Sequence, residues 1–343
     1  MACPHDLSDI DPKANSAACQ QTMQSKNAAL LLVKVVIAGG LILWITQGVD
    51  LRGVLALIAQ ANVPLLVLSF SLFFVGYLIT AFRWRTLIRA QGGDAPIPYL
   101  VQSFMVAVFF NNFLPSTIGG DVVRMYDAWR LGNSRSNAVA VVVVDRFLGV
   151  SVLLLFALVA LTIDSVVAQN LPMVEVWAGL AILGFAAACG MILTAPVSWL
   201  RERAAGTRGI ALRLLDFLAK LLESFQTYRE ARGAIGKAFG LSILLQLNVV
   251  IHFTLVAMAL GINVPTEAMF LVIPIAVFVM MIPISINAIG VRETIFIVLL
   301  SAYGVSDVAA LALAWTAYGF SLAQGILGGI LFALRKESGT SFR

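Results

Sequence analysis

The sequence has little charge, and this scarcity excludes a water-soluble fold. Only 12% of its 343 residues are charged and 60% are hydrophobic, whereas a soluble domain carries about 25% charged residues. The mean hydropathy is +0.94. Because apolar runs of about 20 residues recur along the chain, we expect an all-α polytopic membrane protein.

Histidine and cysteine are too few to build the common metal or catalytic sites. The chain has only His5 and His252, and its three cysteines, Cys3, Cys19 and Cys189, have no CxxC spacing. Neither a zinc site nor a disulfide framework follows, and HExxH, Walker-type lysine and GxSxG motifs are absent. We therefore expect no metal, no cofactor and no ordinary enzyme activity.

The start of the chain lacks the features of a secretory leader. Residues 1–27 have neither a short apolar core nor a small-residue cleavage site, so we expect a disordered cytoplasmic tail. Residues 28–335 are predicted to form one transmembrane domain, with halves at about 28–163 and 173–335. Residues 336–343 are predicted to form a second cytoplasmic tail.

Apolar runs indicate about six full transmembrane helices. They cover residues 28–47, 63–82, 138–163, 173–197, 237–260 and 309–334. Two further apolar segments are broken, 97–120 by Pro115 and 269–303 by Pro283 and Gly290. A membrane tolerates such breaks where the chain is buried in protein or lines a polar cavity.

Lysine and arginine set the predicted orientation, because short basic loops stay in the cytoplasm. Segments 83–94 and 198–237 are basic, whereas 164–175 and 261–268 have acidic but no basic residues. The spans close consistently only if both broken segments are re-entrant hairpins that enter from opposite faces. Both termini are then cytoplasmic, in a bacterial-type inner membrane. An amphipathic helix at about 209–228 is expected to lie on the inner surface or to pack on the cytoplasmic ends of the spans.

The two broken segments resemble each other. Pro115 and Arg124 match Pro283 and Arg292 at a constant offset of 168 residues, and the same offset relates neighbouring spans. With hairpins that enter from opposite faces, the halves are predicted to form an inverted repeat. Many secondary transporters have this architecture and bind substrate near the bilayer midplane, where discontinuous helices meet.

Charged residues in or beside these segments are the candidate functional groups. Two of them, Asp145 and Arg146, lie within an apolar span, where a charge near the helix centre costs about 2.5–3.5 kcal/mol. The hypothesis is that three arginines hold a lipid phosphate, while three carboxylates orient the arginines or bind a coupling ion. These residues are Arg124, Arg146 and Arg292, with Asp121, Asp145 and Glu293. The alternative is a set of buried ion pairs that fixes helix packing.

Uncharged residues beside the first break complete the predicted headgroup site. Asn111 and Asn112 precede it, and Gly119 and Gly120 follow it. The glycines offer backbone N–H groups at the start of a helix, where an anion binds favourably. For His252, a hydrogen bond between helices is the simpler explanation.

Three separated motifs carry a family resemblance. They are FFNNFLPSTIGGDVVR at 109–124, VVDR at 143–146 and IPISINAIGVRE at 282–293. Together they resemble the flippase-like transmembrane region of lysylphosphatidylglycerol synthases and its stand-alone relatives, over about residues 28 to 335. The resemblance implies movement of a lipid between leaflets. Because the chain ends at Arg343 without a soluble synthase domain, we expect that it does not itself aminoacylate a lipid.

The predicted function is therefore a membrane lipid transporter, or flippase, for an anionic or modified phospholipid or a related lipid phosphate. The alternative is an intramembrane enzyme, or an accessory subunit for a partner synthase that modifies a lipid or polyprenyl phosphate. A membrane phospholipid and a lipid-modifying enzyme are the expected partners. The sequence is compatible with a homo-oligomer, but it argues against nucleic-acid binding because the basic residues lie in loops between spans.

Overall fold

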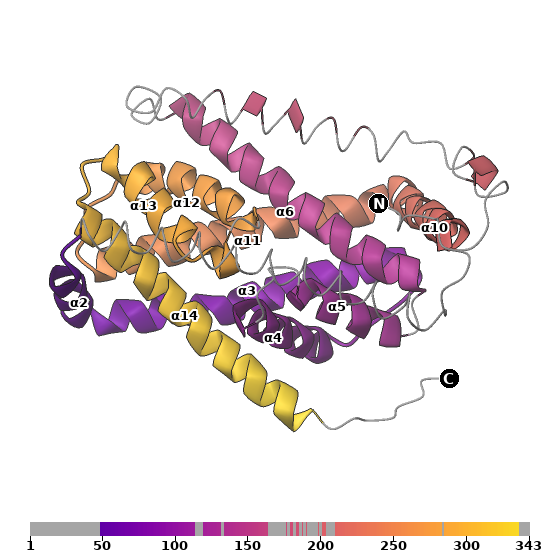
Figure 1. The fold of residues 1–343 in the computed structure, drawn as a ribbon, viewed down its shortest axis with the longest axis horizontal. Helices are drawn as coiled ribbons and strands as arrows, with labels where there is room; N and C mark the ends of the chain where they lie inside the picture. Colours follow the sequence, from indigo (N-terminus) through magenta and orange to yellow (C-terminus); the bar gives the residue numbers. More distant parts are fainter. Residues whose placement is uncertain are drawn as a thin grey trace, which may run out of the picture.

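The computed structural model describes residues 49–113, 119–131, 134–163, 210–282 and 285–335, with isolated residues between 176 and 203. All regular structure in these ranges is helical (Figure 1). The helices are α2 (Leu51–Ala59), α3 (Val63–Ala90), α4 (Ile97–Phe113), α5 (Gly119–Arg130), α6 (Arg135–Ile163), α10 (Ile210–Glu230), α11 (Arg232–Ala259), α12 (Thr266–Met281), the 3-10 helix η1 (Ile286–Ala288), α13 (Val291–Ser301) and α14 (Asp307–Leu334).

Four helices in the described part of the chain are long and apolar enough to cross a membrane, namely α3, α6, α11 and α14. They coincide with four of the predicted spans and confirm a multi-pass helical membrane protein. Each is longer than predicted; α3, for example, continues from residue 82 to Ala90. The predicted span at 28–47 and most of the one at 173–197 lie outside the described residues.

Each predicted break separates two helices that pack against each other, α4 from α5 and α12 from α13. The residues that join α4 to α5, 114–118, lie outside the described ranges. A helix does begin at the two glycines of the first segment, and α5 continues from Gly119 as far as Arg130. The two pairs lie toward opposite ends of the long helices (Figure 1). Their re-entrant path through a membrane stays a prediction.

The order of helices repeats along the chain. Adding 168 to the bounds of α3, α4, α5 and α6 gives 231–258, 265–281, 287–298 and 303–331. Each bound lies within four residues of the corresponding bound of α11, α12, α13 or α14. The offset found from two matched residues therefore holds for four consecutive helices.

The equivalent helices α3 and α11 lie side by side and run in opposite directions. At one end the N–H of Asn62 donates to the Ala259 carbonyl (2.8 Å), and farther along Arg83 donates to the Ser242 hydroxyl (3.0 Å). In addition, α4 packs on α14 while its equivalent α12 packs on α6. A two-fold exchange of the halves produces these matched contacts, so the arrangement agrees with the predicted inverted repeat.

The apolar core of the described residues has two main parts, one toward each end of the long helices. One part joins α2, α12, α13, the end of α11 and the start of α14. The other joins α4, α10, the second half of α3 and the first halves of α6 and α11. Polar side chains of Tyr77, Asn248 and Ser321 lie near the middle of α3, α11 and α14.

Two glycines of α14 let it lie close to α4. A Cβ at Gly328 would collide with the carbonyl oxygen of Met105, and one at Gly329 would lie 2.8 Å from the Phe109 ring. A backbone oxygen cannot move aside as a flexible side chain can. The close contact between these helices therefore depends on the absence of a side chain at Gly328.

Gly328→Ala is expected to destabilise the folded protein by about 1–3 kcal/mol, because the added methyl group forces α4 and α14 apart. Thermal unfolding in detergent measures the change. Gly319→Ala is the matched control, since a Cβ at Gly319 on the same helix meets nothing within 4 Å. Equal unfolding temperatures for the two variants would contradict the close contact.

Candidate functional site

A buried carboxylate, Asp145 of α6, lies between two arginines from other helices. Its Oδ1 is 2.6 Å from Nε of Arg83 on α3, and its Oδ2 accepts a hydrogen bond from Nη2 of Arg124 on α5 at 2.8 Å. The carboxylate is 2% exposed and neither arginine side chain is more than 7% exposed. A single side chain thus ties α3, α5 and α6 together.

A second carboxylate, Asp121, extends these contacts. Arg146 donates to it from Nη2 at 2.9 Å and from Nε at 3.0 Å, while Nη1 of Arg124 lies 3.7 Å away. We call these five residues, Arg83, Asp121, Arg124, Asp145 and Arg146, the arginine network. With three guanidinium groups and two carboxylates, its formal charge is +1. The Arg146 side chain is 41% exposed and is the accessible member.

Aromatic rings cover the guanidinium group of Arg124. Its Cζ lies 4.7 Å from the centroid of the Trp84 ring and 5.1 Å from that of Phe104. Ring faces attract a desolvated cation. Its Nε is buried and has no hydrogen-bond partner among the described residues.

A cavity of about 350 Å³ lies at half the height of the spanning helices. Its lining includes a central residue of each of three 28-residue helices, Tyr77 of α3, Leu245 of α11 and Ser321 of α14. The polar lining side chains are Tyr77, Thr80, Asn248, His252, Tyr318 and Ser321. Among the described lining residues, Arg292 alone is charged. We call this space the central cavity.

Arg292 reaches the central cavity from the first turn of α13. Its guanidinium lies over the Tyr318 ring, 4.4 Å from the centroid, and Nη2 donates to the Asn287 carbonyl at 3.1 Å. Nη1 is buried and has no hydrogen-bond partner in the described part of the chain. A buried donor left unpaired is costly, so this atom marks a place for an acceptor.

The neighbouring carboxylate, Glu293, caps the helix on which it lies, α13. Its Oε2 accepts the N–H of Gly290 at 2.7 Å and so caps α13. Gly290 has a φ of 82°, a conformation that glycine adopts without steric penalty. The predicted role of Glu293 in ion coupling stays a prediction.

The repeat explains why Arg292 and Arg124 have different surroundings. The two arginines are equivalent at the offset of 168, but the equivalents of Asp121 and Asp145 are Ile289 and Leu313. Leu313 is fully buried. The second half therefore places apolar side chains where the first half has carboxylates.

The two broken segments meet at Asn112. Its Oδ1 accepts hydrogen bonds from Nδ2 of Asn287 (3.3 Å) and from the Ser321 hydroxyl (3.1 Å), and its Nδ2 donates to the Ser321 carbonyl. Asn287 and Ala288 have φ of 49° and 57°. Non-glycine residues rarely adopt this conformation, and such strain clusters at functional sites.

The other predicted residues of the first break are close to one another. Asn111 accepts the N–H of Gly120 at 2.8 Å, and a Cβ at Gly120 would collide with the Ala107 carbonyl oxygen. Gly120 thus lets α5 lie against α4. Gly119, which precedes it, is the first residue of α5. Pro115 and Pro283 lie outside the described residues. The roles of these residues in headgroup binding stay predictions.

Sequence reasoning missed several residues of the site. The sequence places Arg83 in a basic loop at 83–94, but α3 continues past it, and Arg83 is 6% exposed within the arginine network. Arg85 and Arg89 do lie at the helix end, where their hydrogen bonds hold the pKa of Asp94 well below its usual value. The long apolar run before Arg83 gave no sign that the helix continues into charged residues.

Aromatic residues were also missed, because rings are common in any apolar span. Trp84, Phe104 and Tyr318 cover the two buried guanidinium groups. His252 has the expected structural hydrogen bond, with Nδ1 2.7 Å from the Ser69 hydroxyl, and it also lines the central cavity. In the described part of the chain, no group of three His, Cys, Asp or Glu residues is placed to hold a metal ion.

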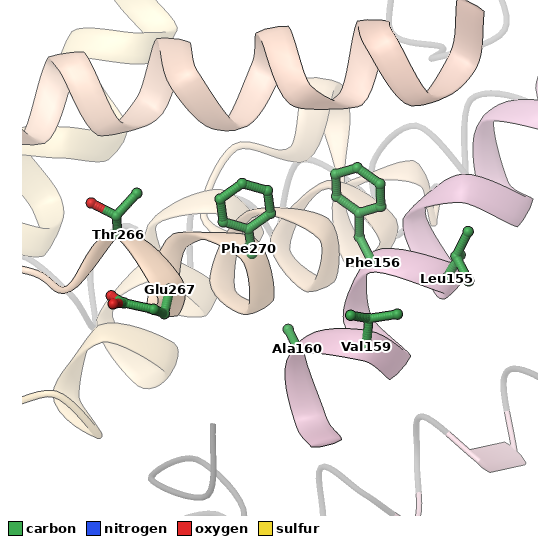
Figure 2. Close-up of a pocket in the computed structure, with 7 residues that line it drawn as sticks. All are labelled: Leu155, Phe156, Val159, Ala160, Thr266, Glu267 and Phe270. Carbon is green, nitrogen blue, oxygen red and sulfur yellow. The ribbon is translucent and has the colours of Figure 1, made fainter. Parts of the chain in front are cut away.

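A second cavity, of about 510 Å³, lies between α6 and α12 (Figure 2). Its walls are mostly apolar, and Thr266 and Glu267 lie at one end. The apolar lining residues are Leu155, Phe156, Val159 and Ala160 of α6 and Phe270 of α12. The chain that follows α6 lies outside the described residues.

Asp145→Asn is expected to destabilise the protein by about 3–5 kcal/mol, because it leaves Arg83 and Arg124 buried without their shared counter-charge. Thermal unfolding in detergent measures the loss. Asp216→Asn is the control, since Asp216 pairs with Lys220 on the surface, where both side chains are more than half exposed. An Asp145→Asn variant as stable as the control would show that the network does not hold the helices together.

The fold defines a polytopic helical membrane protein with a cavity at half the height of its spanning helices. A sequence profile described as the lysylphosphatidylglycerol synthase TM region matches residues 31–329. The chain belongs to this family, and the resemblance of its three motifs is confirmed at that level. A UPF0104 membrane protein from Methanothermobacter thermautotrophicus is 22% identical over 263 residues, which cover 70% of this chain and 74% of the relative.

Proposed function

We propose that this protein is a lipid transporter of the flippase type. It moves an anionic or modified phospholipid, or a related lipid phosphate, between the two leaflets. The observation that carries the proposal is Arg292, the one charged residue in the described lining of a cavity at half the height of the spanning helices, whose buried Nη1 has no hydrogen-bond partner among the described residues.

The principal barrier to leaflet exchange is the transfer of a charged headgroup through hydrocarbon. A phosphate oxygen that accepts a hydrogen bond from Arg292 Nη1 replaces part of the lost hydration, and a guanidinium–phosphate contact is stronger than a neutral hydrogen bond. Asn248 and Ser321 add neutral polar groups to the lining. The volume of about 350 Å³ lies within the usual range for small-molecule sites.

The acyl chains stay in an apolar environment while the headgroup crosses. The cavity between α6 and α12, with its apolar walls, offers a surface for such a chain (Figure 2). The lipid therefore crosses with its headgroup among the helices and its chains among hydrocarbon.

The arginine network is a second group of residues that contact the headgroup. Arg146 meets a headgroup first, because its side chain is 41% exposed. Asp121 and Asp145 hold Arg146 and Arg124 in place and are the candidates for ion coupling. Together with Glu293, they are the carboxylates through which an ion gradient would drive transport.

We assign binding and movement to the chain, but no bond-making chemistry. The described lining of the central cavity contains one guanidinium and no carboxylate, so it does not offer the usual pairing of a general acid with a general base. A partner enzyme would make or consume the lipid. The protein, alone or as a homo-oligomer, would lie in an inner membrane with both termini in the cytoplasm.

Arg292→Ala is expected to slow leaflet exchange of a labelled anionic phospholipid in proteoliposomes by about 10- to 100-fold, the range of a hydrogen bond to a charged group. Arg292→Lys should restore only part of the rate, because lysine lacks the planar fork. Arg89→Ala is the matched control, since Arg89 is 56% exposed and shares Asp94 with Arg85.

Unchanged exchange in a folded Arg292→Ala protein would contradict the proposed site. Wild-type protein that exchanges no anionic or aminoacylated lipid would contradict the transporter itself. Formation of a modified lipid by the purified chain alone would favour the enzyme alternative.

A further inference from the structure

One aromatic ring stands between the central cavity and the arginine network. Phe104 of α4 lines the cavity, and the guanidinium carbon of Arg124 lies over the same ring at 5.1 Å. Trp84 covers the guanidinium as well, at 4.7 Å. Arg124 is 2% exposed, so the rings and its carboxylate partners shut it off from the cavity.

The region behind Phe104 has a surplus of positive charge. The arginine network has three guanidinium groups for two carboxylates. The buried Nε of Arg124 has no hydrogen-bond partner among the described residues. An anion that passed Phe104 would therefore meet both an uncompensated charge and a free donor.

Ring contacts hold Phe104 in place. Its ring packs against Tyr77, with the centroids 5.7 Å apart. Tyr77 also lines the cavity, and its hydroxyl donates to Gln324. Tyr77 is thereby fixed to α14, whereas a phenyl ring has no hydrogen bond to break when it turns.

An aromatic ring between the arginine and the cavity is found in the first half of the repeat but not at the equivalent position of the second half. The equivalent of Phe104 at the offset of 168 is Val272, which is fully buried. Arg292, the equivalent of Arg124, itself lines the cavity and has only Tyr318 as a ring partner in the cation contacts of the described residues. The two equivalent arginines thus differ in whether an aromatic ring separates them from the cavity.

We propose that Phe104 is a gate between two binding positions for an anionic headgroup, Arg292 in the central cavity and Arg124 in the arginine network. This inference rests on the proposed function. In the position seen in the structure, the ring closes Arg124 off. When the ring turns aside, a phosphate held by Arg292 reaches Arg124. The gate thus separates two positions of the headgroup along the path between leaflets.

Chemical labelling of arginine tests the gate without relying on transport. Wild type, Phe104→Ala and Phe110→Ala would be treated with phenylglyoxal in lipid nanodiscs, and the modified arginines identified by mass spectrometry. Phe110 is the matched control because it lies on the same helix but packs against Phe109 and Phe332. Phe104→Leu replaces the alanine variant if that variant does not fold.

The gate predicts labelling of Arg292 in all three proteins and at least threefold more labelling of Arg124 in Phe104→Ala than in wild type or Phe110→Ala. Equal labelling of Arg124 in the three proteins would overturn it. So would failure of the reagent to label Arg292 in any of them, because the cavity would then not be reachable.

The same variants in the leaflet-exchange assay separate the gate from the proposed function. Faster exchange with Phe104→Ala and slower exchange with Phe104→Trp support both. If Phe104→Ala increases the labelling of Arg124 but neither wild type nor any variant exchanges lipid, the gate is supported and the transporter is overturned. The transporter is supported and the gate is overturned if wild-type exchange depends on Arg292, but Phe104→Ala changes neither the exchange rate nor the labelling of Arg124.

Discussion

The buried carboxylate of Asp145 is the shared counter-charge of two arginines that come from two other helices. Without it, Arg83 and Arg124 would be uncompensated charges in a region of low dielectric, which is strongly unfavourable. The contact fixes α3, α5 and α6 relative to one another. The position of α5 then determines where Arg124 and Asp121 lie, so the whole arginine network depends on this interaction.

The second half of the chain is built on the same helix order but lacks this carboxylate. Leu313 replaces it, and the equivalent arginine, Arg292, is left with a ring face and a backbone carbonyl as its partners. In the first half, carboxylates pair with the arginine, whereas in the second half the arginine lines the central cavity and has an unpaired Nη1 among the described residues. Under the proposed function, this asymmetry leaves Arg292 as the position that receives the anionic headgroup.

Sequence patterns predicted the long helices, the broken segments and the repeat, because length, hydropathy and proline positions report directly on membrane helices. The end of α3 was misplaced, because Arg83 and Arg85 look like loop residues when only hydropathy is considered. The sequence singled out Arg124, Asp145 and Arg146, which lie close together in the structure, and their role in headgroup binding stays a prediction. It could not show that Arg292 lies apart from them, at the central cavity, because that separation depends on how the halves pack and on which ring, Phe104 or Tyr318, covers each guanidinium.

The most direct test of the central claim is a cryo-electron microscopy structure of the protein in nanodiscs of anionic phospholipid, with no other ligand added. The account predicts a lipid headgroup in the central cavity, with a phosphate oxygen within hydrogen-bonding distance of Arg292 Nη1. Ordered lipid only on the outer surface of the helices, with Nη1 bonded to a group of the protein itself, would contradict it.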